Sequence, residues 1–181
     1  GGKYNSGGLI GYSHGGWVRS CSFSGQVSGN GTKVGGLVGD CDGDHLGIYD
    51  STSFSIRTIG LYNVGGFIGT SFAEISNCSS TGDVFGIDRV GGFIGSGGRI
   101  DNCSSIGNVT SFGNKTGGFA GYGSSIEYCK SVGDVLSSGN STGGFVGFNG
   151  GDISWSNSRG NVSGNDRVGG FIGETYGGYN S

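Results

Sequence analysis

The sequence predicts an all-β fold, a β-solenoid of about six to seven coils with a repeat of about 26 residues. Three observations predict it: a hexapeptide that recurs at nearly constant spacing, a second block with period two, and an unusual Gly content. The chain has 181 residues, of which 46 are Gly and none is Pro or Met. Because Gly destabilises a helix interior by about 1 kcal/mol relative to Ala, this composition disfavours helix throughout.

The hexapeptide sets the period of the chain. It reads VGGFIG in three copies, with close variants such as SGGLIG and TGGFAG in the others. The copies begin at residues 6, 34, 64, 90, 116, 142 and 168, so the last four spacings are equal. A fixed period of about 20–50 residues is typical of stacked repeats. We therefore expect one domain over residues 1–181, in which each copy begins a coil.

The second block has the form Cys-x-Ser-x-Gly-x-Val, as in Cys103–Val109 and Cys129–Val135. Small or apolar residues alternate in it with mostly polar ones, which indicates a strand with one face toward the core. Stacked coils place equal positions in columns about 4.8 Å apart. The cysteine column should therefore point inward, with Ser156 continuing it and Cys41 outside it. Its members are Cys21, Cys78, Cys103 and Cys129.

These thiols have two possible roles. A metal ladder is one, but thiols in a single strand column point the same way and cannot surround an ion tetrahedrally. Free Cys also behaves as a small buried hydrophobe. We therefore interpret the column as structural.

The hexapeptide places two apolar residues side by side, and a strand has only one face toward the core. Either a bend at the Gly pair turns both inward, or one column forms an exposed stripe through which chains associate. The first residues of these pairs are Leu9, Leu37, Phe67, Phe93, Phe119, Phe145 and Phe171.

Composition argues against several functions. The net charge is −3, and Lys and Arg are scattered singly. No basic stripe is present to neutralise phosphates, which argues against nucleic acid as a partner. No apolar run approaches the roughly 20 residues of a membrane-spanning helix. His14 and His45 lie in different units, and no hexapeptide has the GK[ST] ending of a phosphate loop. We expect no enzyme activity and no resident cofactor.

Acidic residues provide the remaining candidates for a site. Asp40, Asp42 and Asp44 surround Gly43 and form either a calcium loop or a solvated acidic loop, since Ca²⁺ prefers oxygen ligands. A carbohydrate-active β-helix would need paired carboxylates. The three Glu residues are expected at turns, one per coil, and are Glu74, Glu127 and Glu174.

The hexapeptide followed by Ile-x-Asn-Cys-x-Ser-x-Gly-x-Val resembles the GLUG repeat of bacterial surface proteins. Residues 75–84 and 100–109 match that pattern closely, whereas the unit from Val34 to Asn63 fits it poorly. The GLUG repeat occurs in adhesin-like chains and beside the peptidase domains of secreted IgA proteases. The resemblance implies an extracellular, cell-surface, non-catalytic stalk or adhesive segment, and it carries over no functional residues.

The expected function is therefore structural or adhesive: a secreted stalk segment or a self-assembling fibre subunit. The alternative is a carbohydrate-binding or carbohydrate-active β-helix module. Ice binding would need a flat, regular array of Thr, which the columns lack.

Neither end of the sequence resembles a cap, and residues 179–181 echo residues 4–6. Chains could therefore stack head to tail into a filament, or neighbouring repeats of a longer chain could continue the stack. Surface glycans are a further candidate partner.

Overall fold

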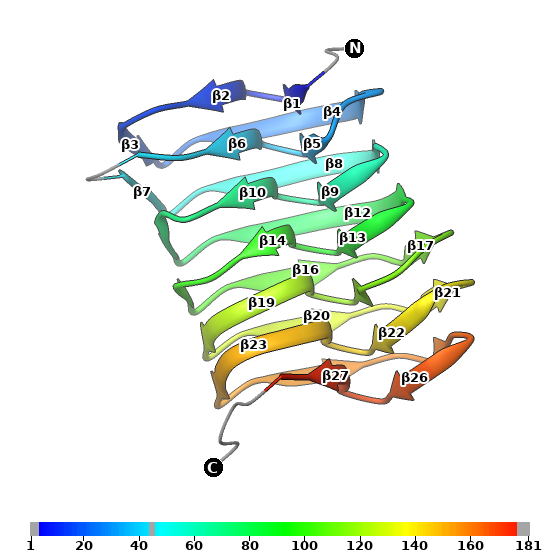
Figure 1. Ribbon diagram of the computed structural model, residues 1–181. Coiled ribbons are helices and arrows are strands. Elements are labelled where there is room, and N and C mark those ends of the chain that lie inside the picture. Colours follow the sequence, from blue (N-terminus) through cyan, green and yellow to red (C-terminus); the bar gives the residue numbers. More distant parts are fainter. Residues whose placement is uncertain (1–3, 44–45, 177–181) are drawn as a thin grey trace.

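The computed structural model describes residues 4–43 and 46–176. Within these ranges the chain is a stack of parallel coils that follow the period of the hexapeptide and contain no helix, which confirms the predicted β-solenoid (Figure 1). Each coil contributes strands to three parallel sheets, here called A, B and C. Equal positions pair across coils, as Val34 does with Val64 and Val64 with Val90, so the columns expected from the repeat exist.

Sheet A holds the start of every hexapeptide. Its strands are β1 (Asn5–Gly7), β5 (Lys33–Gly35), β9 (Tyr62–Gly65), β13 (Asp88–Gly91), β18 (Thr116–Gly117), β22 (Asn140–Gly143) and β26 (Asp166–Gly169).

Sheet B has two rows of strands, which merge in the two longest strands of this sheet, β19 (Ala120–Glu127) and β23 (Val146–Ser154). The first row is β2 (Ile10–Ser13), β6 (Val38–Cys41), β10 (Ile68–Ser71), β14 (Ile94–Gly97) and, beyond β23, β27 (Ile172–Thr175). The second row is β3 (Gly16–Arg19), β7 (Leu46–Tyr49), β11 (Glu74–Ser76) and β15 (Ile100–Asp101).

Sheet C closes each coil and contains the Cys-x-Ser-x-Gly-x-Val block. In the first coils one strand spans the block: β4 (Ser22–Ser28), β8 (Thr52–Ile59) and β12 (Ser79–Gly86). Later coils break it at the Gly into β16 (Ser104–Ile106), β20 (Lys130–Val132), β24 (Asn157–Arg159) and then β17 (Val109–Ser111), β21 (Val135–Ser137), β25 (Val162–Ser163).

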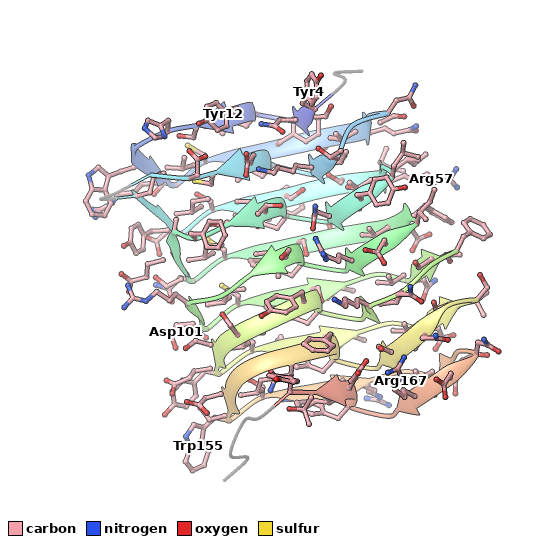
Figure 2. All side chains as sticks on the ribbon, in the orientation of Figure 1. Tyr4, Tyr12, Arg57, Asp101, Trp155 and Arg167 are labelled. Atoms are coloured by element: carbon pink, nitrogen blue, oxygen red, sulfur yellow. The ribbon has the colours of Figure 1, made fainter. Side chains whose placement is uncertain are left out.

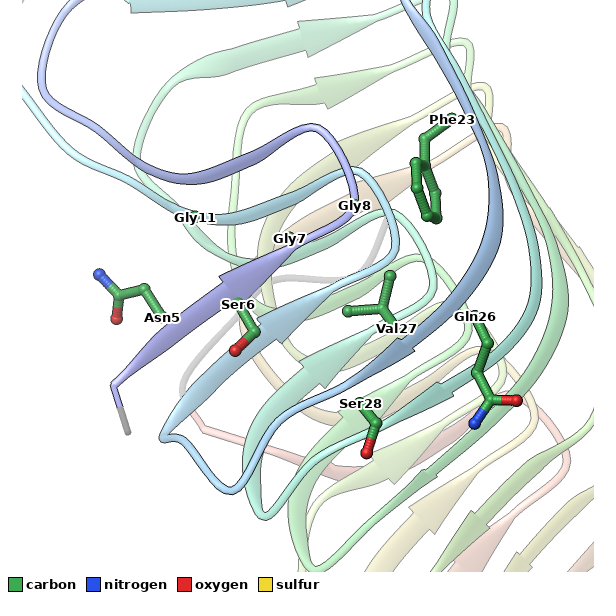
Figure 3. A pocket seen from close by; sticks show the side chains of 9 residues that line it. All are labelled: Asn5, Ser6, Gly7, Gly8, Gly11, Phe23, Gln26, Val27 and Ser28. Carbon is green, nitrogen blue, oxygen red and sulfur yellow. The ribbon is translucent and has the colours of Figure 1, made fainter. Parts of the chain in front are cut away.

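The hexapeptide is a sharp inward bend. At its first copy the chain runs through Gly7, turns at Gly8 and passes back along Gly11 (Figure 3). The two limbs of the bend touch backbone to backbone. In the third copy, for example, a Cβ on Gly65 would overlap the carbonyl oxygen of Ile68 on the other limb. Gly is therefore required here for close approach of backbones rather than for positive φ.

The tip of the bend is fastened to sheet C by a serine column. The Oγ of Ser105 donates to Gly118 O at 2.8 Å, and Ser80 makes the same bond to Gly92 O at 2.9 Å. Each serine is the third residue of the Cys-x-Ser block, and each acceptor is the second Gly of the following hexapeptide. The two repeated motifs thus form one contact, between the Cys-x-Ser block of one coil and the hexapeptide that begins the next coil.

The bend divides the interior into two cores. The larger one lies between sheets B and C and contains the Phe column, the Ile column and the cysteines. The smaller one lies between sheets A and C and consists of Val27, Val34, Val64, Val84, Val90, Val109 and Val135.

The bend also answers the question left open by the two apolar columns. Phe67, Phe93, Phe119 and Phe145 are all 0% exposed, and so are the neighbouring Ile68, Ile94, Ala120 and Val146. Consecutive Phe rings stack with centroids 4.7–4.9 Å apart, and Phe171 extends the stack. Because this ladder lies inside the chain, it offers no stripe for association, and that alternative is wrong.

The corners use other residues as well as Gly. Two corner columns hold non-Gly residues in the left-handed region. One column is Ser20, Asp50, Asn77, Asn102, Tyr128 and Trp155, and the other is Asn63, Arg89, Lys115, Ser141 and Arg167. Asn and Asp tolerate this conformation, whereas bulky residues adopt it at a cost of about 1 kcal/mol or more. Stacking between coils maintains it.

The close approach of backbones at the bend predicts that Gly92 cannot be replaced by a larger residue without loss of stability. An added Cβ would overlap the carbonyl oxygen of Gly118 in the next coil, so Gly92→Ala should lower the free energy of unfolding by about 3 kcal/mol or more. Gly170 is the matched control, because it holds the same place in the last coil and a Cβ there has nothing within 4 Å. Urea denaturation of both variants measures the difference. Equal losses would contradict backbone contact as the reason for this Gly.

The serine column gives a second prediction. Ser105→Ala leaves a buried carbonyl without its donor, which should cost about 1–3 kcal/mol of unfolding free energy. Ser158 makes the same bond, to Gly170 O at 3.1 Å, but at a solvent-exposed position where water can replace the hydroxyl. Ser158→Ala should therefore cost less than about 1 kcal/mol in the same measurement. A larger loss for Ser158→Ala would show that the bond is not what these serines contribute.

Candidate functional site

The outer side of the second row of sheet B is the best candidate for a binding surface. Its inward residues, from Val18 through Ile48 to Ile126, are buried, so the residues on either side of each must point outward. Register aligns Trp17 with Glu74 through Gly47, and Asp101 with Glu127. We call this surface the side strip, and define it as Trp17, Arg19, Tyr49, Phe72, Glu74, Arg99, Asp101, Ser125, Glu127, Tyr128, Asp152 and Trp155.

One end of the side strip is an aromatic cluster. The rings of Trp17 and Tyr49 stack with centroids 5.7 Å apart, and the Arg19 guanidinium lies 5.0 Å from both. Tyr49 Oη donates to Glu74 Oε2 at 3.4 Å. Desolvation, together with the nearby Glu74 carboxylate, raises the pKa of Tyr49 above its usual value. The Tyr49 hydroxyl thus donates to a carboxylate beside an exposed indole.

The other end carries a second stacked pair. Tyr128 and Trp155 have ring centroids 6.2 Å apart and are nearly parallel, at an interplanar angle of 7°. Both residues occupy the left-handed corner column, each with φ of 49°. Figure 2 shows Asp101 and Trp155 on the same side of the stack, with Asp101 above Trp155.

Two adjoining hollows lie along the side strip. One, of about 340 Å³, is lined by Trp17, Tyr49, Phe72, Glu74 and Arg99 among others. The second, of about 270 Å³, is lined by Glu74, Arg99, Ile100, Asp101, Ser125 and Glu127. Glu74 and Arg99 border both, so the hollows lie next to each other across successive coils, and together they are called the depression below.

A third hollow, of about 420 Å³, lies at the first described coil (Figure 3). Its lining includes Gly7, Gly8, Phe23 and Val27, which hold core positions in the coil. This hollow is the uncovered cross-section of the interior, and among the described residues no charged side chain lines it.

The acidic candidates are distributed differently from the sequence prediction. Asp40 is not a loop carboxylate: it lies in β6, is 3% exposed, and pairs with Lys33 Nζ at 2.6 Å. Asp42 accepts from Tyr12 Oη and contacts His14 Nδ1, both at 2.8 Å. These contacts lower the pKa of Asp42, the His14 hydrogen bond most and the Tyr12 hydrogen bond next. Asp44 lies outside the described residues.

With Asp40 neutralised by Lys33, two of the three expected calcium ligands already have protein partners. Residues 4–43 and 46–176 contain no group of three or more His, Cys, Asp or Glu that could hold a metal ion. The calcium loop that includes Asp44 stays a prediction.

The three Glu residues were expected at turns and lie in strands instead. Glu74 begins β11, Glu127 ends β19, and Glu174 lies in β27. Glu74 and Glu127 belong to the side strip, whereas Glu174 pairs with Arg167 at 2.9 Å and accepts from Ser141. His45, like Asp44, lies outside the described residues.

Comparison with protein families identifies the repeat. A family model, the GLUG motif, matches residues 60–84 and 88–110. The chain carries GLUG repeats. Comparison with curated proteins and with solved structures gave no significant match. The described residues include no helix with the length and hydropathy that crossing a bilayer requires.

In each matched GLUG repeat, the residues that recur are those that build the coil. The hexapeptide forms the bend, the serine fastens it, and the Cys packs in the larger core. The candidates on the side strip lie instead at variable positions; Asp101, for example, comes directly before the Asn of Asn-Cys, and Glu74 and Arg99 come three places before it. Sequence reasoning named Glu74 and Glu127 as candidate carboxylates but missed the other residues of the side strip because they do not repeat. The residue preceding each buried Ile was the available signal.

The cysteines of the GLUG repeats form a column of acceptors. The backbone N–H of Cys78 donates to Cys103 Sγ, and that of Cys103 to Cys129 Sγ, both at 3.3 Å. Ser51 and Ser156 take the same role for Cys21 and Cys129, at 3.1 Å. Cys41 lies apart in β6, where burial raises the pKa of its thiol to about 11. Burial raises the pKa of Cys103 as well.

Thiol reactivity tests this arrangement. All five cysteines are free, but Cys41, Cys78, Cys103 and Cys129 are buried and only Cys21, in the first coil, is partly exposed. Because the reagent must reach the sulfur atom, a chromogenic disulfide reagent at mildly alkaline pH should modify at most Cys21 quickly in the native protein. All five should react at once in denaturant. Rapid native modification of the other four would contradict the inward column.

Proposed function

We propose that this GLUG-repeat β-solenoid is a non-catalytic structural segment of an extracellular protein, a rigid spacer with an adhesive side. The observation that carries the proposal is the use of the repeated residues. Gly, Ser, Cys and Phe of each unit make contacts with the next coil, such as Ser105 to Gly118 O, and they are buried. When the recurring residues of a repeat serve only to stack its coils, the number of repeats sets the length of the segment, as a spacer requires.

The three sheets run through successive coils, which supports the proposal that the segment is rigid. Strands pair in parallel from coil to coil in all three sheets, from β1 to β26 in sheet A, for example. Backbone hydrogen bonds therefore run along the stack, as from Phe67 N to Phe93 O at 2.9 Å and from Phe93 N to Phe119 O at 2.8 Å. Six coils at about 4.8 Å per coil give a segment about 30 Å long.

The first and last described coils support continuation of the stack. Leu9 in the first hexapeptide and Val168 in the last are both 46% exposed, whereas the equivalent residues between them are buried. Another coil of the same kind would cover them. It could belong to neighbouring repeats of a stalk or to a second chain of a fibre, and both fit a spacer.

A non-catalytic role fits the surroundings of His14. This side chain is 72% exposed, and among the described residues its ring contacts Asp42 and Tyr12, neither of which is a Ser or Cys nucleophile. The GLUG resemblance supports an extracellular location, since that repeat occurs in secreted and surface-attached chains.

Duplication of a coil tests the spacer. Inserting further copies of residues 116–141 after Ser141 should leave the fold intact and lengthen the particle by about 4.8 Å per copy, so three copies add about 14 Å. Small-angle X-ray scattering measures the maximum dimension. The matched control inserts the same segment in scrambled order, which should give a disordered extension instead. Insertion of intact units without lengthening would refute a spacer whose length follows its repeat number.

A further inference from the structure

We infer that the side strip binds an extended, neutral glycan chain. This inference deepens the proposed function by naming the partner of the adhesive side, and it depends on that function only for its biological setting. Four observations carry it: where the tryptophans lie, which polar groups stand between them, the length of the depression, and its charge.

Both tryptophans of the chain belong to the side strip. Trp17 is 60% exposed and Trp155 is 77% exposed, and Phe72 beside the first hollow is 77% exposed. Trp exposed to this degree buries large area on binding and is enriched among residues that dominate binding energy. The C–H faces of a sugar ring are apolar and flat, and they match an aromatic face. The clustering of aromatics at the two ends therefore indicates two stacking platforms.

Polar groups fill the space between the platforms. Glu74, Arg99, Asp101 and Glu127 line the depression, and the ion pairs found among the described residues involve other side chains. A carboxylate offers two acceptor oxygens and a guanidinium five N–H donors, all in one plane. Vicinal hydroxyls of a sugar can donate to the first and accept from the second. The depression thus combines aromatic faces with convergent polar groups, a combination typical of ligand sites.

The depression is long rather than deep. Its lining runs from Trp17 to Glu127, which is four coil steps or about 19 Å, and Trp155 lies one coil step further along the side strip. Its two hollows share Glu74 and Arg99, so one ligand can pass through both. The side strip runs along the stack on the left side of the view in Figure 2. A linear chain with repeated rings fits this shape.

The net charge of the side strip indicates which class of glycan it binds. The side strip carries four carboxylates and two guanidiniums, so it is net negative; the carboxylates are Glu74, Asp101, Glu127 and Asp152, and the guanidiniums are Arg19 and Arg99. Like charges facing each other disfavour association. Sulfated or uronic-acid chains are therefore disfavoured, and neutral hexose or N-acetylhexosamine chains are favoured.

The test uses the 181-residue chain with cellohexaose, xylohexaose and chitohexaose as probes. At least one should bind and change the intrinsic fluorescence, because both tryptophans lie on the surface that binds. Trp17→Ala and Glu74→Gln should each weaken that binding by about tenfold. Heparin should not compete.

Phe112→Ala is the matched control. Phe112 is 71% exposed and follows β17, at the opposite edge of the coil from β3 (Figure 1). Removing it should leave binding unchanged. Since all three side chains are at the surface, the urea midpoints of the variants should equal that of the wild-type protein, which excludes unfolding as the cause.

Other outcomes overturn the inference. Absence of binding by all three probes at millimolar concentration does so, as does equal weakening by Phe112→Ala, or a preference for heparin. Self-association that Trp17→Ala abolishes would assign the strip to a second copy of the chain instead. None of these results affects the lengthening expected from inserted coils, so failure here and failure of the spacer are distinguishable. A probe recovered as shorter sugars would refute the non-catalytic role while supporting glycan recognition.

Discussion

The rest of the structure depends on one contact, the close packing of backbone against backbone at the hexapeptide bend. Its limbs approach so closely that a Cβ on Gly65 would overlap the carbonyl oxygen of Ile68. Only Gly permits this approach, and only this approach lets two consecutive apolar residues both face inward. The Phe stack and the separate valine core both follow from it. The Gly content is therefore a packing requirement and not a sign of flexibility.

The same contact holds the outer surface in place. Because the bend is fastened through Ser80 and Ser105 to sheet C, each coil has one register with respect to the next. Side chains on the second row of sheet B then stand in fixed columns, with a buried Ile behind each pair. A surface built this way is preorganised: aromatic and charged groups are held at set intervals without needing a deep cleft.

The repeat period and the alternation of small and polar residues made the coil predictable from the sequence. Contacts between different motifs could not be predicted in this way. The constant spacing of the hexapeptide indicated the columns, and the alternation around Cys103 indicated the inward face. The bond from Ser105 to Gly118 O joins residues that have no common pattern, so nothing in the sequence linked them. Ser51 in the cysteine column escaped notice because its unit is longer than the others. Asp40 appeared to belong to an acidic loop because its partner Lys33 lies on the other limb of the bend.

The side strip was the least predictable part, because Trp17 and Trp155 are far apart in the chain and come together only through five coil steps of register. Residue identities that differ in every unit carry no period, so pattern analysis has nothing to detect.

The direction of the backbone hydrogen bonds has a mechanical consequence. They lie along the axis of the stack, from one coil to the next, as between Phe93 and Phe119. Tension applied at the two ends therefore opens the ladder one coil at a time instead of shearing it all at once. Each released coil of about 26 residues frees roughly 90 Å of chain at about 3.4 Å per residue. A segment that is stiff at rest would thus dissipate a pull in discrete steps, and would re-form coil by coil on the template of its neighbour when the load falls.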